Sequence, residues 1–277
     1  MGPGCPQLLK LRLMIKPAIL IILFIVLNFS LKAQSWELGA SVGGAGYMGE
    51  LNESNPVSIS GVAFGAFVQK NLNGYFSLKL NYNYGKIGAT DANSNNPQMR
   101  ARNLSFNTTL NEFSVIGELN FFNYIPQLSK SKISPYILLG VAVANYVPTT
   151  VYNGKVYDLR QATTEGQTAP YSTVALSVPF GAGVKYNITG AWTLSADIGY
   201  RATNTGYLDD VSGYYPNLPS NVAPITKILS DRSGEKTGVY IGTPGTQRGD
   251  LNTHDIYYFA QVSISFTFLS QKCFFER

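Results

Sequence analysis

Cysteine and histidine are almost absent from this chain of 277 residues, which has two cysteines and one histidine. A metal site built from cysteine and histidine is therefore excluded by count. Charge is scarce as well, because Asp, Glu, Lys and Arg make up 13% of the residues, about half of the usual share. After residue 34 no stretch has 18 consecutive apolar residues, which excludes membrane-spanning helices from that part of the sequence.

Aromatic residues and glycine are abundant instead, with 18 Tyr, 15 Phe and 27 Gly. Low charge together with many aromatic residues and glycines is typical of a β protein that meets lipid.

The N-terminal segment has the features of a secretory signal peptide. Basic residues precede an apolar run over residues 18–27, and Ala33 is a small residue suited to cleavage. We predict a signal peptide over residues 1–33, in which residues 1–13 could be an over-called start. Its removal takes Cys5 away, so that Cys273 has no partner for a disulfide within the mature chain.

The signal peptide also carries four of the 21 basic residues, while all 16 acidic residues lie outside it. The mature chain is then nearly neutral, so its charge does not indicate nucleic-acid binding.

Eight segments of the mature chain alternate between apolar and small polar side chains. In residues 255–268, for example, Val262 and Ile264 share one parity and Ser263 and Ser265 share the other. Period two predicts β-strands, and each segment has at least the 9–11 residues that a tilted strand needs to cross a membrane. A soluble sandwich would show the same alternation, so the pattern alone does not decide between the two.

The connections between these segments alternate between short and long. NLNG and NITG have the composition of tight turns, whereas residues 88–103, 148–171 and 203–254 form long connections. This asymmetry is typical of bacterial outer-membrane barrels. We therefore predict an all-β, eight-stranded antiparallel outer-membrane β-barrel over residues 34–268, with short periplasmic turns, longer extracellular loops and a short C-terminal tail at residues 269–277.

Two sets of side chains follow from this prediction. Outward-facing aromatic residues near strand ends are expected to form girdles at the lipid interfaces, namely Trp36, Phe76, Tyr84, Phe121, Tyr186, Trp192, Tyr200, Phe266 and Phe268. Inward-facing charged residues are expected to form a polar network in the lumen, namely Glu37, Lys79, Glu112, Glu118, Lys185, Asp197 and Arg201. Because an eight-stranded barrel is only wide enough for its own side chains, we expect a structural plug of paired charges rather than a conducting pore.

Residues with catalytic or metal-binding chemistry are few. His254 could be the centre of a lipid-modifying hydrolase, but nothing in the sequence places a serine beside it. Asp209 and Asp210 could hold a cation, yet their surroundings do not follow a calcium-loop pattern, and turn formation is the favoured interpretation. We predict no enzymatic activity, no cofactor and no metal.

Six segments resemble the PorG-like outer-membrane barrels of Bacteroidota, a family of the DUF6089 type. They are WELGASVGGAGYMGELN, SPYILLGVAV, YNGKVYDLRQATTEGQ, LSVPFGAGVKYNIT, GYRATNTGYLDDVSGYYPN and QRGDLNTHDIYYFAQVSISFTF, and the resemblance extends from about residue 35 to residue 268. Its most specific parts are LDDVSGYYPN and RGDLNTHDIYYF, which contain Asp209, Asp210, Arg248 and Asp250.

The resemblance implies an accessory barrel of the type IX secretion system that contacts the periplasmic ring of PorK and PorN, with outer-membrane lipid around it. A stand-alone structural or adhesion barrel that acts through its extracellular loops is the alternative. The lipid-modifying enzyme centred on His254 is the third and weakest hypothesis.

Overall fold

The computed structural model describes residues 35–52, 55, 57–251 and 254–269. The predicted signal peptide and residues 270–277 of the predicted tail lie outside the described residues. Among the described residues, no helix is long and apolar enough to span a membrane.

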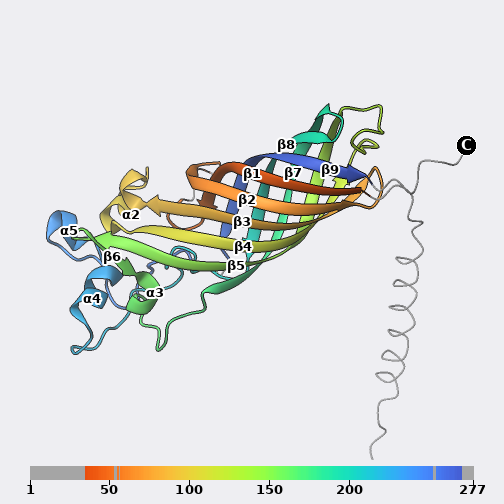
Figure 1. Ribbon diagram of the computed structural model, residues 1–277. Coiled ribbons are helices and arrows are strands. Elements are labelled where there is room, and N and C mark those ends of the chain that lie inside the picture. The colour runs from red at the N-terminus through yellow and green to blue at the C-terminus, as the bar shows by residue number, and fades with distance from the viewer. Residues whose placement is uncertain (1–34, 53–54, 56, 252–253, 270–277) are drawn as a thin grey trace, which may run out of the picture.

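Eight antiparallel strands close into a barrel, which confirms the predicted fold (Figure 1). Neighbouring strands follow the order β4-β3-β2-β1-β9-β8-β7-β5, and pairing between β4 and β5 closes the ring. The barrel strands are β1 (Ser35–Met48), β2 (Ile59–Asn71), β3 (Phe76–Thr90), β4 (Ser105–Asn120), β5 (Ile133–Tyr152), β7 (Val174–Thr189), β8 (Trp192–Thr203) and β9 (Ile256–Leu269). The short strand β6 (Lys155–Asp158) pairs with the end of β5.

The alternation in sequence becomes an alternation of exposure, with apolar side chains on the outside of the ring. Strand β5 is apolar on both parities, so closure of the barrel decides which of its side chains face outward and which face the lumen. Leu139 and Val141 are exposed on the outside, whereas Tyr136 and Leu138 are buried inside. The outward faces of the other strands are likewise rich in exposed Val, Leu, Ile and aromatic residues. A closed barrel with such an exterior is of the outer-membrane type, because hydrocarbon can cover the apolar belt.

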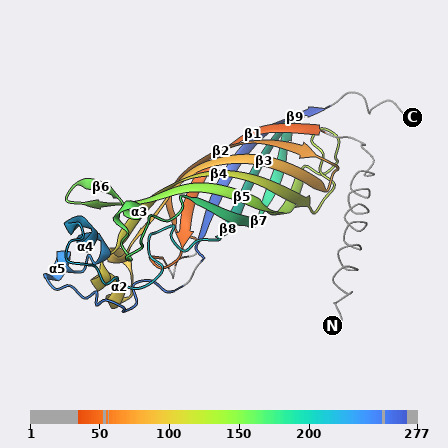
Figure 2. The ribbon, with the colours of Figure 1, turned by 90° about the horizontal axis from the view of Figure 1, so that it is seen from below.

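The two ends of the barrel differ in their connections. Ser35 of β1 pairs with Leu269 of β9, so both ends of the described barrel lie at the end where residues 72–75, 121–132 and 190–191 connect the strands (Figure 2). The three longest connections, which follow β3, β5 and β8, lie at the opposite end. Short turns face the periplasm in outer-membrane barrels, so the opposite end is extracellular.

The extracellular connections fold into a structured unit, which we call the outer cap and define as residues 91–104, 153–173 and 204–251 (Figure 1). Its helical elements are η1 (Asp91–Asn93), α2 (Pro97–Arg102), α3 (Leu159–Ala162), α4 (Pro224–Ser230) and α5 (Gly234–Thr237). Strand β5 has 20 residues, about twice what a membrane crossing needs. The barrel wall therefore extends beyond the membrane to support the cap.

The apolar belt predicts how the barrel responds to a charge on its outer face. Leu80 lies on the outside of β3, is more than half exposed, and pairs with Val68 and Val115. We expect Leu80→Arg to lower the free energy of unfolding by about 2–4 kcal/mol, because the charge would face hydrocarbon. Tyr84→Arg, nearer the outer interface, should cost about 1 kcal/mol or less. Urea titrations of both variants in lipid vesicles would measure this, and equal losses would contradict a membrane-facing β3.

Candidate functional site

Charged side chains in the periplasmic half of the lumen form a buried cluster around Glu118. Its carboxylate pairs with Lys79 and, at 2.5 Å, with Lys185. The three residues come from β4, β3 and β7, and the Glu118 side chain is fully buried. Tyr136 adds its ring face, 4.8 Å from the Lys185 amine. These contacts join β7 to two strands with which it does not pair, β3 and β4.

A second cluster lies farther out and is centred on Glu112. The Arg201 guanidinium binds both carboxylate oxygens of Glu112, at 3.0 and 3.3 Å. The Tyr257 hydroxyl donates to the same carboxylate at 2.6 Å, and the Asn83 amide donates at 3.2 Å. The Arg201 guanidinium also stacks on the Phe259 ring at 4.6 Å. Every oxygen of the buried carboxylate is thereby satisfied, as a buried charge requires.

The remaining two lumen residues of the predicted network bind neutral groups. Glu37 accepts hydrogen bonds from Asn71 at 2.6 Å and Ser265 at 2.9 Å. Asp197 accepts one from the Tyr136 hydroxyl at 2.9 Å. Neither forms an ion pair within the described part of the chain. The expectation that the lumen charges pair throughout is therefore too simple, since hydroxyl and amide donors suffice for these two carboxylates.

The outer half of the lumen holds a hydrophobic core beside the Glu112 cluster, which corrects the expectation of a polar interior along the whole barrel. Inward-facing Phe106, Leu110, Tyr146 and Phe259 are buried there and belong to the main hydrophobic core. The same core includes Leu208 of the outer cap. Because the cap covers this end, the inward side chains pack against it rather than against water.

The outward aromatic residues of the predicted girdles lie at two levels. Near the periplasmic ends of their strands are Trp36, Phe76, Phe121, Tyr186, Trp192, Phe266 and Phe268. Tyr84 and Tyr200 lie eight residues farther along β3 and β8 than Phe76 and Trp192. Eight residues of strand span about 27 Å, or about 20 Å along the axis of a tilted barrel. This separation approaches the height of the apolar band in such barrels.

The motif residues Asp210 and Arg248 join the outer cap from within. Asp210 has a left-handed backbone with φ of 68° and accepts hydrogen bonds from Thr164 and, at 2.7 Å, from Tyr171. Arg248 pairs with Glu165 at 2.9 Å and with Asp210 at 3.7 Å. Burial raises the pKa of Asp210 to about 6, although Arg248 acts to lower it. Asp250, the fourth motif residue, is exposed.

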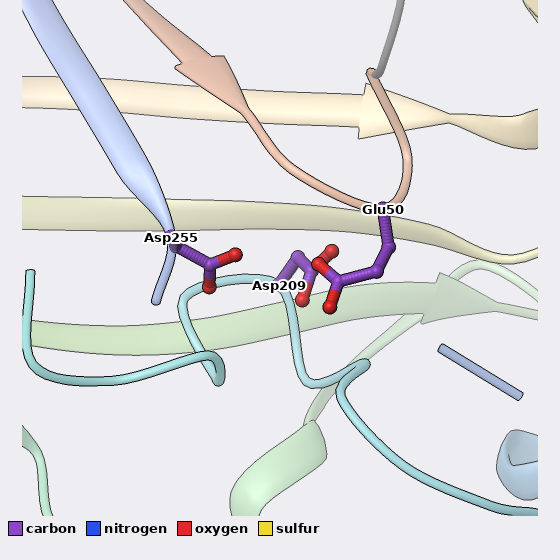
Figure 3. Close-up of side chains that lie close together, drawn as sticks. All are labelled: Glu50, Asp209 and Asp255. Carbon is purple, nitrogen blue, oxygen red and sulfur yellow. The ribbon is translucent and has the colours of Figure 1, made fainter. Parts of the chain in front are cut away.

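Asp209 turns away from Asp210 and meets two carboxylates from other segments. Glu50 follows β1, Asp255 precedes β9, and one oxygen of each of the three carboxylates lies within 4.8 Å of the others (Figure 3). All three residues are at least 98% buried. Burial, followed by the charge of Asp255, raises the pKa of Asp209 well above its usual value. Burial also raises the pKa of Asp255 to about 7.

Sequence reasoning missed this arrangement because its members are far apart along the chain. It singled out the neighbours Asp209 and Asp210, which the fold separates into two different networks. Glu50 carried no signal in the sequence, since its surroundings match no binding motif. We call Glu50, Asp209 and Asp255 the acidic triad.

His254 and Asp255 are neighbours in sequence but face different surroundings. His254 is exposed, whereas the buried carboxylate of Asp255 accepts a hydrogen bond from the Leu208 amide at 2.9 Å. The Asp255 carboxylate therefore faces the interior of the mouth.

A protein family matches most of the chain. The family described as "Domain of unknown function (DUF6089)" matches residues 16–222. The chain belongs to this family. The DUF6089 match includes Glu50 and Asp209 but ends before Arg248 and Asp255, and it is shorter than the resemblance found in the sequence. No curated protein matches the chain.

Solved structures similar to this DUF6089 protein are outer-membrane barrels of low sequence identity. The N-terminal barrel domain of OprF from Pseudomonas aeruginosa is 15% identical, with 86% of this chain and 100% of that chain covered and a TM-score of 0.38. The attachment invasion locus protein Ail of Yersinia pestis, in complex with a heparin analogue, is 10% identical, with 86% and 99% covered and a TM-score of 0.38. A major outer-membrane protein of Thermus thermophilus is 11% identical, with 85% and 100% covered and a TM-score of 0.39.

Proposed function

We propose that this barrel is a non-enzymatic accessory component of the type IX secretion system, which binds ring proteins of the PorK and PorN kind at its periplasmic end. The resemblance of the sequence to PorG-like barrels suggests this partner. The lumen supports a role as an anchor, because Glu118, Glu112 and their cations fill it with buried, paired side chains. A wall that is tied across its interior is suited to holding a partner in place.

The connection between β4 and β5, residues 121–132, supports this proposal most directly, because it is ordered and carries exposed apolar side chains. It is the longest of the three described connections at the periplasmic end. Tyr124 anchors it, because the buried Tyr124 ring lies at the base of the lumen and its hydroxyl hydrogen-bonds with Thr193 of β8 at 2.9 Å. The Tyr124 amide donates to the Gly74 carbonyl at 2.8 Å. The connection is thus held in place across the end of the barrel.

The same connection presents apolar and basic side chains to the periplasm. Phe122 and Leu128 are both more than 40% exposed, and Lys130 and Lys132 are exposed beside them. Exposed aromatic residues on a rigid segment are typical anchors of protein interfaces. We infer that the ring protein binds over this surface.

Site-specific crosslinking would test the proposal. A photoreactive amino acid at Leu128 should crosslink to a PorK- or PorN-like protein in cells that assemble the ring. The same group at Tyr240, which is exposed on the outer cap, serves as the matched control and should give no such product. The proposal would be contradicted if Leu128 gave no crosslink to a ring protein in cells that assemble the ring, while Tyr240 crosslinked to an extracellular ligand.

We expect replacement of the exposed residues to weaken the binding of ring proteins while the barrel still folds. Phe122→Ser combined with Leu128→Ser should lower the recovery of ring proteins in pull-downs by about tenfold or more, since such anchors contribute over about 1 kcal/mol each. Secreted cargo should then accumulate inside the cell. Tyr240→Ser combined with Ile241→Ser is the control and should leave both readouts unchanged. Unchanged recovery in the first variant would exclude this surface.

A second candidate function, adhesion through the extracellular loops, is favoured by one observation on the outer cap. Tyr240 and Ile241 are exposed, yet their segment is fixed because the Ile241 amide donates to Ser233 and the Gly242 amide donates to Asp231. An ordered apolar segment facing outward suits ligand binding. The Tyr240 arm of the crosslinking experiment distinguishes this function from the first.

A further inference from the structure

We propose that the acidic triad, Glu50, Asp209 and Asp255, binds a divalent cation of the calcium type at the extracellular mouth of the barrel. The three carboxylates converge from three separate segments of the chain (Figure 3). Such a site would connect the loop after β1, the loop after β8 and the start of β9. This role is separate from the periplasmic partner, so its test is independent of the proposed function.

The buried negative charge of the triad favours a bound cation. Three carboxylates are buried together, and a buried carboxylate is costly unless a positive charge or enough donors compensate it. The arginines that lie nearby are engaged with other acids. Arg102 donates to both carboxylate oxygens of Asp91 at 2.8 Å, and Arg248 pairs with Glu165 and Asp210. The contact of Arg102 with Glu50 is to its backbone carbonyl.

The triad also has too few hydrogen-bond donors for its oxygens. The Tyr47 hydroxyl lies 2.6 Å from Asp209, 3.2 Å from Glu50 and 3.4 Å from Asp255, but it has one proton to donate. The amides of Leu208 and Val211 each donate to one further oxygen. The Oε1 atom of Glu50 is buried at the triad and has no hydrogen-bond partner in the described part of the chain.

That buried oxygen is an independent sign of a ligand. Buried polar atoms nearly always have a partner, which can be an ion. The Glu50 side chain points toward the other two carboxylates (Figure 3), so an ion held among the three would supply this partner. Gly49 preserves the close approach, because a Cβ there would meet the Tyr47 hydroxyl and the Asp255 carboxylate.

The geometry favours calcium among the common ions. Ca²⁺ binds oxygen ligands at about 2.3–2.6 Å, so two ligands of one ion lie at most about 5 Å apart. The 4.8 Å limit on the oxygens of the triad fits this range. Mg²⁺ requires about 2.0–2.1 Å and tends to keep its waters. Zinc prefers nitrogen and sulfur ligands, which the triad does not offer.

Calcium titration of the mature barrel, refolded in detergent and stripped with a chelator, would test the proposal. Isothermal titration should give one Ca²⁺ per chain with a dissociation constant of about 10⁻³ M or tighter, the range of extracellular calcium modules. Mg²⁺ should bind more weakly. Glu50→Gln, Asp209→Asn and Asp255→Asn should each weaken Ca²⁺ binding about tenfold or more.

Asp158→Asn is the matched control, because Asp158 is an outer-cap carboxylate that caps α3 and asparagine caps a helix equally well. It should leave Ca²⁺ binding unchanged. Heat-modifiability on gels would verify that each barrel is folded. Should a triad variant fail to fold, limited proteolysis of the wild type decides the question, and Ca²⁺ should slow cleavage within residues 204–251.

Several results would overturn the proposal. They are a folded wild type with no saturable Ca²⁺ binding, triad variants that bind as tightly as the wild type, and proteolysis that is equally fast with and without Ca²⁺. If the wild type binds no Ca²⁺ and the triple variant Glu50→Gln, Asp209→Asn, Asp255→Asn melts no lower, the carboxyl groups hold protons instead.

Discussion

Glu118→Gln should destabilise this barrel more than any other single substitution in the lumen. The change leaves the amines of Lys79 and Lys185 buried without the carboxylate that both of them contact. Removing one partner of a buried ion pair costs about 3–5 kcal/mol, because the other charge remains desolvated. Here two cations lose their partner, so we expect a loss at the upper end of that range. Urea unfolding in lipid vesicles would measure it.

Ser114→Ala is the matched control for Glu118→Gln. Ser114 lies on the same inward face of β4, is buried, and its hydroxyl has no hydrogen-bond partner among the described residues. Its replacement should therefore change the free energy of unfolding by less than about 1 kcal/mol. Combining Glu118→Gln with Lys79→Met and Lys185→Met should recover part of the loss, since the unpaired charges are removed as well. A small effect of Glu118→Gln alone would mean that water reaches the cluster.

Arg248→Ala should loosen the outer cap while the barrel stays folded. The Arg248 side chain pairs with Glu165 and donates to the backbone carbonyls of Ser230 and Asp210 at 3.1 and 2.6 Å. Its loss leaves two buried carboxylates, Glu165 and Asp210, without their cation. We expect the cap to lose about 3 kcal/mol or more of local stability. Limited proteolysis should then cut residues 204–251 at least about 100-fold faster.

Arg100→Ala is the control for Arg248→Ala. Arg100 belongs to α2 of the same cap, but it is exposed and its guanidinium contacts the Ser94 carbonyl. Its replacement should leave the cleavage rate within a few-fold of the wild type, because exposed contacts contribute little. Heat-modifiable migration should persist in both variants, since the barrel strands pair independently of the cap. Simultaneous loss of cap and barrel in Arg248→Ala would show that the two fold as one unit.

The acidic triad and the Arg248 network would hold the long loops over the barrel in two different ways. Arg248 satisfies its acids with a guanidinium that the chain itself supplies. Among the described residues, no cationic side chain pairs with the three carboxylates of the triad. An external cation would supply the missing positive charge. Both lie on the extracellular side, whereas the proposed partner surface, with Phe122 and Leu128, lies at the periplasmic end.

Strand β9 shows why the barrel could be predicted from sequence. Its alternation between Val262 or Ile264 and Ser263 or Ser265 is a local property, and the structure exposes the first pair and buries the second. Period two survives folding because successive side chains of a strand must point to opposite faces. In β5 both parities are apolar, so only the register with β4 and β7 decides that Tyr136 faces inward and Ile137 outward.

The sequence by itself determined that this chain forms an eight-stranded outer-membrane barrel, because alternation, strand number and loop length are local properties of the sequence. It also identified Glu112 and Glu118 as inward-facing charges. Only the tertiary structure decided which charges meet and where the lumen holds a hydrophobic core. Tyr47 and Asp255 lie 208 positions apart, and contacts between such distant segments depend on closure of the ring and on how the loops fold over it.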